Sequence, residues 1–274
     1  NLGLVARDQD QTQKALEYHF KSLKIRKEIF GKNHPSLSDS YNNIALAMRA
    51  QKRYDEALTY YQKSVKLIIE GGYHPHEATC YSNIGLLFED QADYDKALEY
   101  YNRGKKTFDE YLGEKNLHSG DCYKLMSRVY EKEKKFKDLI ACQKKCIEIR
   151  QSILGEYHEN IAQLYYELGR LFFRYSLWNE AELAFQKAIE IRAKAIGDLN
   201  EEIAETYWSL GVAQSNNGRL SMGLENLLIS KKIYEDIHGE NHESVALSYV
   251  SIGLAQKSIL NEELAIENLE KGIK

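Results

Sequence analysis

The sequence predicts an all-α solenoid in which antiparallel helix pairs stack on one another. One small residue recurs at intervals of 40 or 42 residues, at Gly3, Ala45, Gly85, Ser127, Gly169, Gly211 and Gly253. A second small or apolar residue follows each of these by twelve residues, at Ala15, Ala57, Ala97, Leu139, Ala181, Gly223 and Ala265. Self-similarity at a fixed period is the signature of repeat architectures, in which each unit packs only on its neighbours.

The first helix of each predicted pair carries an aromatic, an aliphatic, a small and a large residue. Tyr165, Leu168, Gly169 and Phe172 show this frame. Because the spacings are three, four and seven, the side chains share one stripe of a helix. The small residue is needed where two helices cross closely. The same frame begins at Tyr41, Tyr81, Tyr123, Tyr207 and Tyr249.

The second helix of each pair carries a small residue followed four positions later by an aromatic one. Ala97 and Tyr101 form such a pair, as do Ala57 with Tyr61 and Ala181 with Phe185. In the other repeats the pattern weakens to Leu139 with Gln143, Gly223 with Leu227 and Ala265 with Leu269. We predict that the two helices bury these residues together, for example Tyr81, Ile84, Phe88, Ala97 and Tyr101.

Each second helix is followed by a Gly and then, three residues later, by a His or an Asn. Examples are Gly31 with His34 and Gly197 with Asn200; the others begin at Gly71, Gly113, Gly155 and Gly239. Glycine supplies a left-handed helix C-cap, and a Pro such as Pro35 blocks continuation of the helix. The recurring histidines are predicted to bond to the loop backbone. They cannot share a metal, because stacked helices lie roughly 8–10 Å apart.

Together these motifs resemble the tetratricopeptide repeat (TPR). The period of 42 exceeds the ordinary repeat of 34 by eight residues, or about two helical turns. Long helices, the Gly-x-x-His-Pro turn and the run from Tyr41 to Leu46 are similar to the kinesin-light-chain class, and nephrocystin-like proteins carry a similar repeat. The resemblance implies a right-handed superhelix whose first helices line a concave groove.

The unbroken period predicts one array over residues 1–274, with about six to seven repeats. The chain begins at Asn1 inside a first helix and closes at Lys274 inside a second helix. We therefore expect a fragment of a longer protein.

Composition and motifs argue against several function classes. The net charge of −4 and the pI near 6.1 argue against nucleic-acid binding, and no stretch is apolar enough to span a membrane. No phosphate-binding loop, dinucleotide fingerprint or nucleophile elbow is present, so we expect no enzyme, cofactor or metal. The four cysteines show no disulfide or metal spacing. They are predicted to be buried free thiols, which indicates a cytoplasmic protein.

Asparagines mark one candidate binding surface on the first helices. The resemblance places Asn42, Asn43 and Asn83 in the groove, and Asn1 in the slot of Asn43. An amide can donate and accept hydrogen bonds at once, which suits the backbone of an extended peptide. The alternative is that these side chains only tie neighbouring helices together.

Basic residues mark a second candidate surface. Residues 103–150 carry 13 Lys and Arg against 8 Asp and Glu. In register, the groove contains Arg49, Lys124, Arg128, Arg170, Arg174 and Trp208, and we expect an aromatic anchor of the partner near Trp208. We predict that four of these residues form one patch for an acidic segment of a partner, namely Lys124, Arg128, Arg170 and Arg174. The alternative is that nearby acids neutralise them, namely Asp121, Glu131, Glu167 and Glu205.

The chain is therefore predicted to be a protein-interaction scaffold that binds a peptide or a partner helix. One alternative is a structural array packed permanently into a large cytoskeletal or ciliary assembly. Another is the regulatory arm of an enzyme outside this sequence. Neither nucleic acid nor membrane is expected as a partner.

Overall fold

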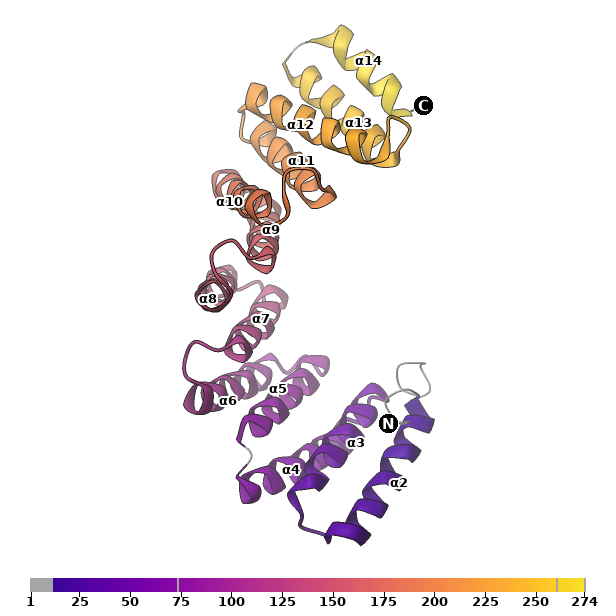
Figure 1. Cartoon of the computed structure of the whole chain (residues 1–274), viewed down its shortest axis with the longest axis vertical. Helices are drawn as coiled ribbons and strands as arrows, with labels where there is room; N and C mark the ends of the chain where they lie inside the picture. Colours follow the sequence, from indigo (N-terminus) through magenta and orange to yellow (C-terminus); the bar gives the residue numbers. More distant parts are fainter. Residues whose placement is uncertain (1–11, 73, 260, 274) are drawn as a thin grey trace. The chain divides into compact units, whose positions relative to one another are not determined.

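The structure is a computed structural model that describes residues 12–72, 74–259 and 261–273. Within these residues it contains thirteen α-helices, one short 3-10 helix and no strand (Figure 1). The all-helical prediction is confirmed. The proposed first-repeat positions Asn1 and Gly3 lie outside the described residues.

The chain divides into two compact units, residues 1–149 and 150–274, which are described separately. In the first unit, α3 pairs with α4 and α5 pairs with α6. Its elements are α2 (Thr12–Phe30), η1 (Pro35–Leu37), α3 (Ser38–Ala50), α4 (Tyr54–Gly71), α5 (His74–Asp90), α6 (Tyr94–Leu112) and α7 (Leu117–Lys132), followed by α8 (Phe136–Leu154), which ends beyond residue 149.

In the second unit, three helix pairs follow one another. They are α9 (Glu159–Arg174) with α10 (Trp178–Ile196), α11 (Glu201–Asn216) with α12 (Leu220–His238), and α13 (Glu243–Ser258) with α14 (Glu262–Ile273). The first helix α11 also contacts both α9 and α13, the first helices of the neighbouring pairs. Side chains from adjacent first helices can therefore line one surface.

The repeated frame builds the core. Tyr81, Ile84, Phe88, Ala97 and Tyr101 are all buried in one cluster, as predicted. The small position is tight because a Cβ placed on Gly85 would lie 2.5 Å from Tyr101 Cε1. In the second unit, a Cβ on Gly169 would lie 2.6 Å from Phe185 Cε1. The frame therefore needs a small residue where a first helix meets the aromatic ring of its partner.

The turns between pairs show why the His or Asn recurs. The imidazole Nδ1 of His158 accepts a hydrogen bond from the Asn160 backbone N–H at 3.1 Å, and His34 and His242 act in the same way. Asn200 caps α11 by accepting from the Ile203 N–H at 2.8 Å. These side chains satisfy N–H groups that the first turn of a helix leaves open. The predicted backbone role of the turn histidines is confirmed for these three; the side chain of His74 lies outside the described part.

The prediction of left-handed glycine caps needs a correction. After α4 the cap is Gly72, with φ 73° and ψ 22°, rather than Gly71. Gly113, Gly197 and Gly239 also have positive φ, but their ψ values are 160°, 173° and 170°. At these residues the backbone combines a positive φ with an extended ψ. Glycine adopts this conformation readily because it has no Cβ.

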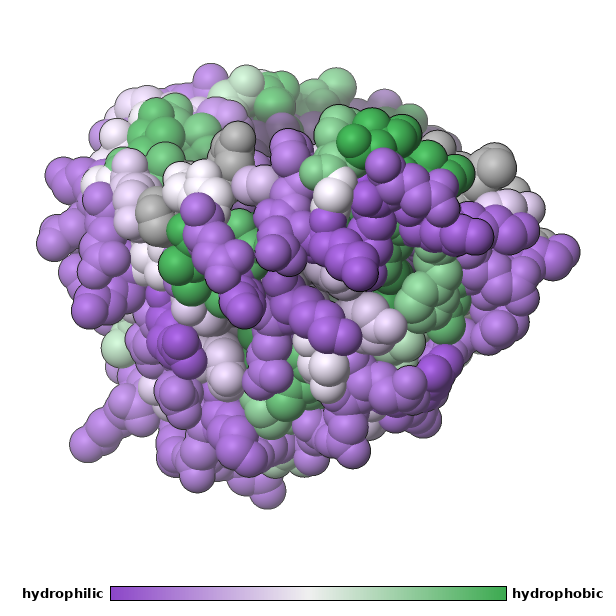
Figure 2. All heavy atoms as spheres, turned by 90° about the horizontal axis from the view of Figure 1, so that it is seen from below, coloured by the Kyte–Doolittle hydropathy of each residue, from purple (hydrophilic) through white to green (hydrophobic). Residues whose placement is uncertain are grey.

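Hydrophilic side chains predominate on the face shown in Figure 2, and hydrophobic ones form separate groups there. None of the helices in the described ranges is long and apolar enough to cross a membrane.

Candidate functional site

A pocket of about 440 Å³ opens between α9 and α11 in the second unit. We call it the α9–α11 pocket. It is lined by Tyr166, Arg170, Phe173, Arg174, Phe185, Glu205, Trp208, Ser209 and Val212. Three residues predicted from the sequence, Arg170, Arg174 and Trp208, therefore lie in one pocket.

Helical periodicity explains why these side chains converge. On α9, each of the lining residues at 166, 170, 173 and 174 has another one three or four positions away, and the same holds for 205, 208, 209 and 212 on α11. Such spacings place side chains on one face of a helix. Phe185 of α10 closes the pocket behind them, where it also packs against Gly169.

Arg170 is an exposed cation of this pocket. Its guanidinium carbon lies 5.8 Å from the centroid of the Tyr166 ring, within the range of a cation–π interaction. Among the residues that the structure describes, it has no ion-pair partner. A positive group is thus held beside an aromatic ring with its hydrogen-bond donors available.

Glu205 lines the same pocket, but its hydrogen-bond partner is Tyr166 and not Arg170. The hydroxyl of Tyr166 donates a hydrogen bond of 2.7 Å to Glu205 Oε1. Burial raises the pKa of Tyr166 to about 12, and the hydrogen bond to the Glu205 carboxylate adds to the shift. The tyrosine therefore stays a neutral donor at physiological pH. The alternative in which Glu205 neutralises Arg170 is not what the structure contains.

Trp208 forms the aromatic side of the pocket. It is 37% exposed, and its indole Nε1 donates to Ser251 Oγ of α13 at 2.8 Å. This bond fixes the indole from the neighbouring repeat while part of its face stays accessible. Such an aromatic ring offers contact area at a small cost in conformational entropy.

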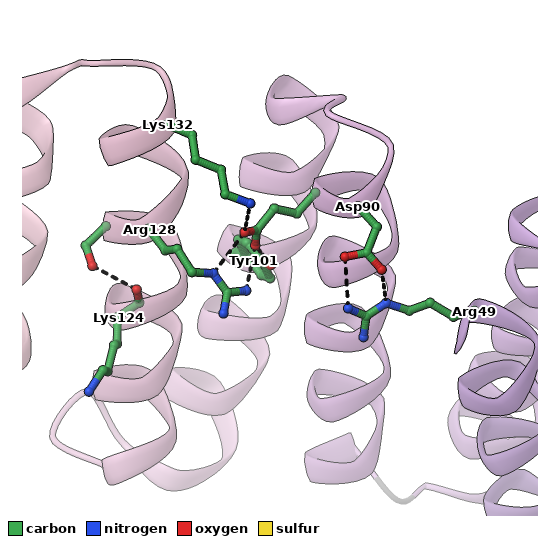
Figure 3. Close-up of polar contacts among 8 residues, drawn as sticks. Arg49, Asp90, Tyr101, Lys124, Arg128 and Lys132 are labelled. Atoms are coloured by element: carbon green, nitrogen blue, oxygen red, sulfur yellow. Dashed lines mark hydrogen bonds and ion pairs between the residues drawn. The ribbon is translucent and has the colours of Figure 1, made fainter. Parts of the chain in front are cut away.

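In the first unit, the candidate arginines are paired within the chain. Arg49 of α3 binds Asp90 of α5, with Nε 2.6 Å from Oδ2. Arg128 of α7 binds Glu89 of α5 through two hydrogen bonds of 2.8 and 2.7 Å. Figure 3 shows Arg128 and Lys132 pointing toward the same carboxylate, with Tyr101 beside it. We call Glu89, Tyr101, Arg128 and Lys132 the Glu89 cluster.

The expected neutralisation of Arg128 thus takes place through an acid that the sequence interpretation did not name as its partner. Glu89 replaces the proposed Asp121 and Glu131 because it reaches Arg128 from the preceding first helix, 39 positions earlier. Lys124 lies with Arg128 around a second pocket of about 420 Å³, which Gln143 of α8 also lines. The single basic patch predicted for Lys124, Arg128, Arg170 and Arg174 would join residues of both units and stays a prediction.

The asparagines on α3 and α5 are partly engaged with each other. Asn83 Nδ2 donates to Asn42 Oδ1 at 3.0 Å, which links two adjacent first helices. Asn43 is half-buried, and its side chain makes no hydrogen bond to a described residue. The structure thus places Asn42 and Asn83 in a helix-tying contact and leaves Asn43 with amide donors and acceptors available.

Sequence reasoning missed Arg192, although a signal was present. Its slot in the repeat is occupied by Ile68 and Phe108, which are 2% and 4% exposed, and by Arg150 in the repeat directly before it. Arg192 is also only 2% exposed. A charged residue at an apolar repeat position marks a departure from the pattern. This arginine lies behind Tyr166, with its guanidinium carbon 5.1 Å from the ring centroid.

No group of three or more His, Cys, Asp or Glu side chains in the described ranges is placed to hold a metal ion. The four cysteines are free and buried. Burial raises the pKa of the Cys80 and Cys122 thiols to about 11, which keeps them protonated and unreactive.

Comparison with known proteins identifies the repeat. A family model described as tetratricopeptide repeat matches residues 1–68, 38–110 and 121–194, which together exceed half of the chain. No curated protein sequence matched the chain.

Several solved structures share the fold. The C-terminal part of a TPR repeat-containing protein from Cytophaga hutchinsonii aligns over 99% of this chain and 93% of its own, with 13% identity and a TM-score of 0.69. BtubC (BKLC) from P. vanneervenii aligns over 84% and 92%, with 17% identity and a TM-score of 0.63. A putative kinesin light chain from P. anserina aligns over 73% and 94%, with 16% identity and a TM-score of 0.59. At these identities the likeness concerns the fold.

Proposed function

Because the chain belongs to the tetratricopeptide-repeat family, whose repeats serve as protein–protein interaction scaffolds, we propose that it binds an acidic segment of a partner protein in the α9–α11 pocket. The observation that carries this proposal is Arg170, an arginine without an ion pair among the described residues in a pocket lined by aromatic rings. An unpaired guanidinium at a concave surface is suited to a carboxylate, which it can bind through two parallel hydrogen bonds.

The pocket also suits an apolar group beside the acid. Its volume of about 440 Å³ falls within the range of ligand pockets. The rings of Phe173, Phe185 and Trp208 provide apolar walls, and Ser209 adds a hydroxyl. We therefore propose a segment in which acidic residues flank an aromatic or large aliphatic side chain, with that side chain against Trp208.

The first unit supports a second candidate role, that of a fixed structural array. Its first-helix surface is largely satisfied from within, through Arg49 with Asp90, Asn83 with Asn42, and the Glu89 cluster. A surface that pairs its own charges favours architecture over exchange of peptides. For this role we propose a place in a large assembly, such as a cytoskeletal or ciliary one. Asn43 is the residue of that surface that we propose for partner contacts.

The proposal treats residues 1–274 as one array, because the spacing of 40 or 42 residues continues through the sequence. It also places the protein in the cytoplasm, a reducing compartment in which four free buried thiols are expected.

Selection from a random peptide display library tests the proposed function. The chain is immobilised, and bound peptides are sequenced for the wild type and for Arg170→Glu. We expect the wild type to enrich peptides with acidic residues around an apolar one, and Arg170→Glu to lose that enrichment. Enrichment of basic or purely apolar peptides, or identical enrichment by both proteins, would reject the α9–α11 pocket as an acidic-peptide site.

A further inference from the structure

The α9–α11 pocket contains an acid that could compete with any acidic ligand. Glu205 of α11 lines the pocket together with Arg170 of α9. Opposite charges that line one pocket can pair, although an exposed pair of this kind adds little stability. In the described structure no ion pair joins the two side chains, and Glu205 Oε1 accepts the hydrogen bond from the Tyr166 hydroxyl.

Tyr166 is itself held from behind by Arg192 of α10. Arg192 Nη1 donates to the Glu202 carbonyl oxygen at 2.9 Å and to Thr206 Oγ1, both on α11. Its Nη2 donates to Gln163 Oε1 of α9 at 2.6 Å. The guanidinium thereby fastens α9 to α11 just behind the Tyr166 ring.

This arginine is unusual for a buried cation. It is 2% exposed, and its hydrogen-bond acceptors are a carbonyl, a hydroxyl and an amide rather than a carboxylate. Burial of a charge without a directly paired opposite charge is costly. The compensating negative charges, including Glu202 and Glu205, act at longer range. Arg192 therefore attracts the Glu205 carboxylate toward the Tyr166 side of the pocket.

We propose that Tyr166 and Arg192 are positioning residues that restrain Glu205 and so keep Arg170 open for an acidic ligand. The inference rests on the proposed function for its consequence in binding, but its structural core, the restraint of Glu205, stands by itself. Tyr166 supplies the hydrogen bond, and Arg192 fixes the ring that supplies it. Without this restraint Glu205 pairs with Arg170 and acts as an internal competitor.

A double-mutant cycle tests the restraint. The probe is a fluorescein-labelled Glu-Glu-Phe-Glu-Glu peptide, with Gln-Gln-Phe-Gln-Gln as the matched neutral peptide, and binding is followed by fluorescence polarisation. Tyr166→Phe removes only the hydroxyl and keeps the ring. Released Glu205 then competes as a surface ion pair, so we expect affinity for the acidic probe to fall roughly two- to fivefold. In a Glu205→Gln background the same substitution should leave affinity unchanged, because the competitor is gone.

Arg192→Lys extends the cycle to the second positioning residue. It keeps a buried cation but removes the forked contacts to both helices. We expect a loss of affinity that likewise disappears in the Glu205→Gln background. Equal losses in both backgrounds, for either variant, would mean that the residue acts on the fold or touches the ligand, and would overturn the proposal. Unfolding midpoints of all variants are measured in parallel to register any change in stability.

A crystal structure of Tyr166→Phe decides the matter independently of ligand binding. We expect a Glu205 carboxylate oxygen to move within ion-pair distance of an Arg170 nitrogen. If Glu205 stays away from Arg170, the restraint does not exist and the inference is wrong. If the wild type fails to bind the acidic probe while this structure shows the new ion pair, the proposed function fails and the restraint of Glu205 stands.

Discussion

Glu89 of α5 and Arg128 of α7 form an ion pair between adjacent repeats. Arg128 Nε lies 2.8 Å from Oε1 and Nη2 lies 2.7 Å from Oε2 of the carboxylate. The carboxylate side chain is 4% exposed, whereas the arginine side chain is 47% exposed. Tyr101 donates a third hydrogen bond of 2.7 Å, and Lys132 a fourth of 2.7 Å. A buried anion is thus satisfied by cations that keep contact with water.

This arrangement makes stability depend on pH in a defined window. Burial alone would raise the pKa of Glu89, but the hydrogen bonds from Arg128, Lys132 and Tyr101 outweigh it and lower the pKa from 4.5 to about 2. A lowered folded-state pKa means that the ionised group stabilises the fold above pH 4.5, and that this stability is lost as the pH falls toward 2. We expect Glu89→Gln to cost about 1–3 kcal/mol at neutral pH.

Urea unfolding of the wild type and Glu89→Gln at neutral pH and near pH 3 checks this prediction. The difference in unfolding free energy should shrink at the acidic pH. Glu240→Gln serves as the control, because Glu240 is an exposed acid of the second unit. A Glu89→Gln difference that is the same at both pH values would contradict the assigned role of the ionised carboxylate.

Substitutions of Asn83 and Asn43 should have different effects on the stability of the protein. Asn83→Ala removes the hydrogen bond to Asn42 and should cost about 0.5–1.5 kcal/mol of stability. Asn43→Ala should leave stability almost unchanged, because its amide makes no hydrogen bond within the described part of the chain. If this surface binds a peptide backbone, the Asn43→Ala and Asn83→Ala double variant should bind a selected peptide roughly tenfold more weakly. Unchanged affinity would leave Asn83 with its helix-tying role only and would remove the proposed binding role of Asn43.

The turns inside the helix pairs contain a position at which a change to glycine should stabilise the protein. Ala92 adopts φ 58°, and Lys52, Lys134 and Ser176 occupy the same turn position with similar values. The last repeat of this series has Gly218 there, with φ 77°. Left-handed backbone costs a residue with a Cβ roughly 1–2 kcal/mol. We expect Ala92→Gly to raise the unfolding free energy by about 0.5–1 kcal/mol, and Gly218→Ala to lower it by a similar amount. Thermal unfolding that shifts both variants in the same direction would refute the assignment.

The small residue at the helix crossing predicts a large destabilisation. A side chain on Gly169 meets the Phe185 ring at 2.6 Å, so Gly169→Val should cost about 1–3 kcal/mol through overpacking. The companion change Phe185→Leu makes room for the new side chain. In a Phe185→Leu background the added cost of Gly169→Val should be smaller. Equal costs in the two backgrounds would show that the ring does not set the limit.

The fold could be predicted from the sequence because the signals are local and repeated. The spacing of Tyr81, Ile84 and Gly85 fixes the buried stripe of α5, and His158 caps α9 within two residues of its own position. The backbone conformations of the glycines after the helices could not be predicted from the sequence. Gly197 and Gly72 both follow a helix, but the path of the next segment decides whether ψ is extended or left-handed.

The candidate site could be predicted only in part. Helical phase placed Arg170, Arg174 and Trp208 on one surface, and they do line one pocket. The pairing of charges depends on the offset between adjacent first helices, which no spacing within one helix reveals. For that reason the partner of Arg128 proved to be Glu89. The contact that holds Glu205 likewise depends on Tyr166 from another helix.

The central claim is that Arg170 recruits an acidic segment, and binding of the labelled Glu-Glu-Phe-Glu-Glu peptide to the full chain tests it most directly. Polarisation is measured for the wild type, Arg170→Glu and the charge-matched control Lys232→Glu, whose substituted residue is exposed on α12. Each titration is repeated as salt rises from about 0.05 M to about 0.5 M, because exposed charges are screened by salt. We predict binding that weakens steeply with salt, is abolished by Arg170→Glu and is retained by Lys232→Glu. Binding that is insensitive to both salt and Arg170→Glu would contradict the account.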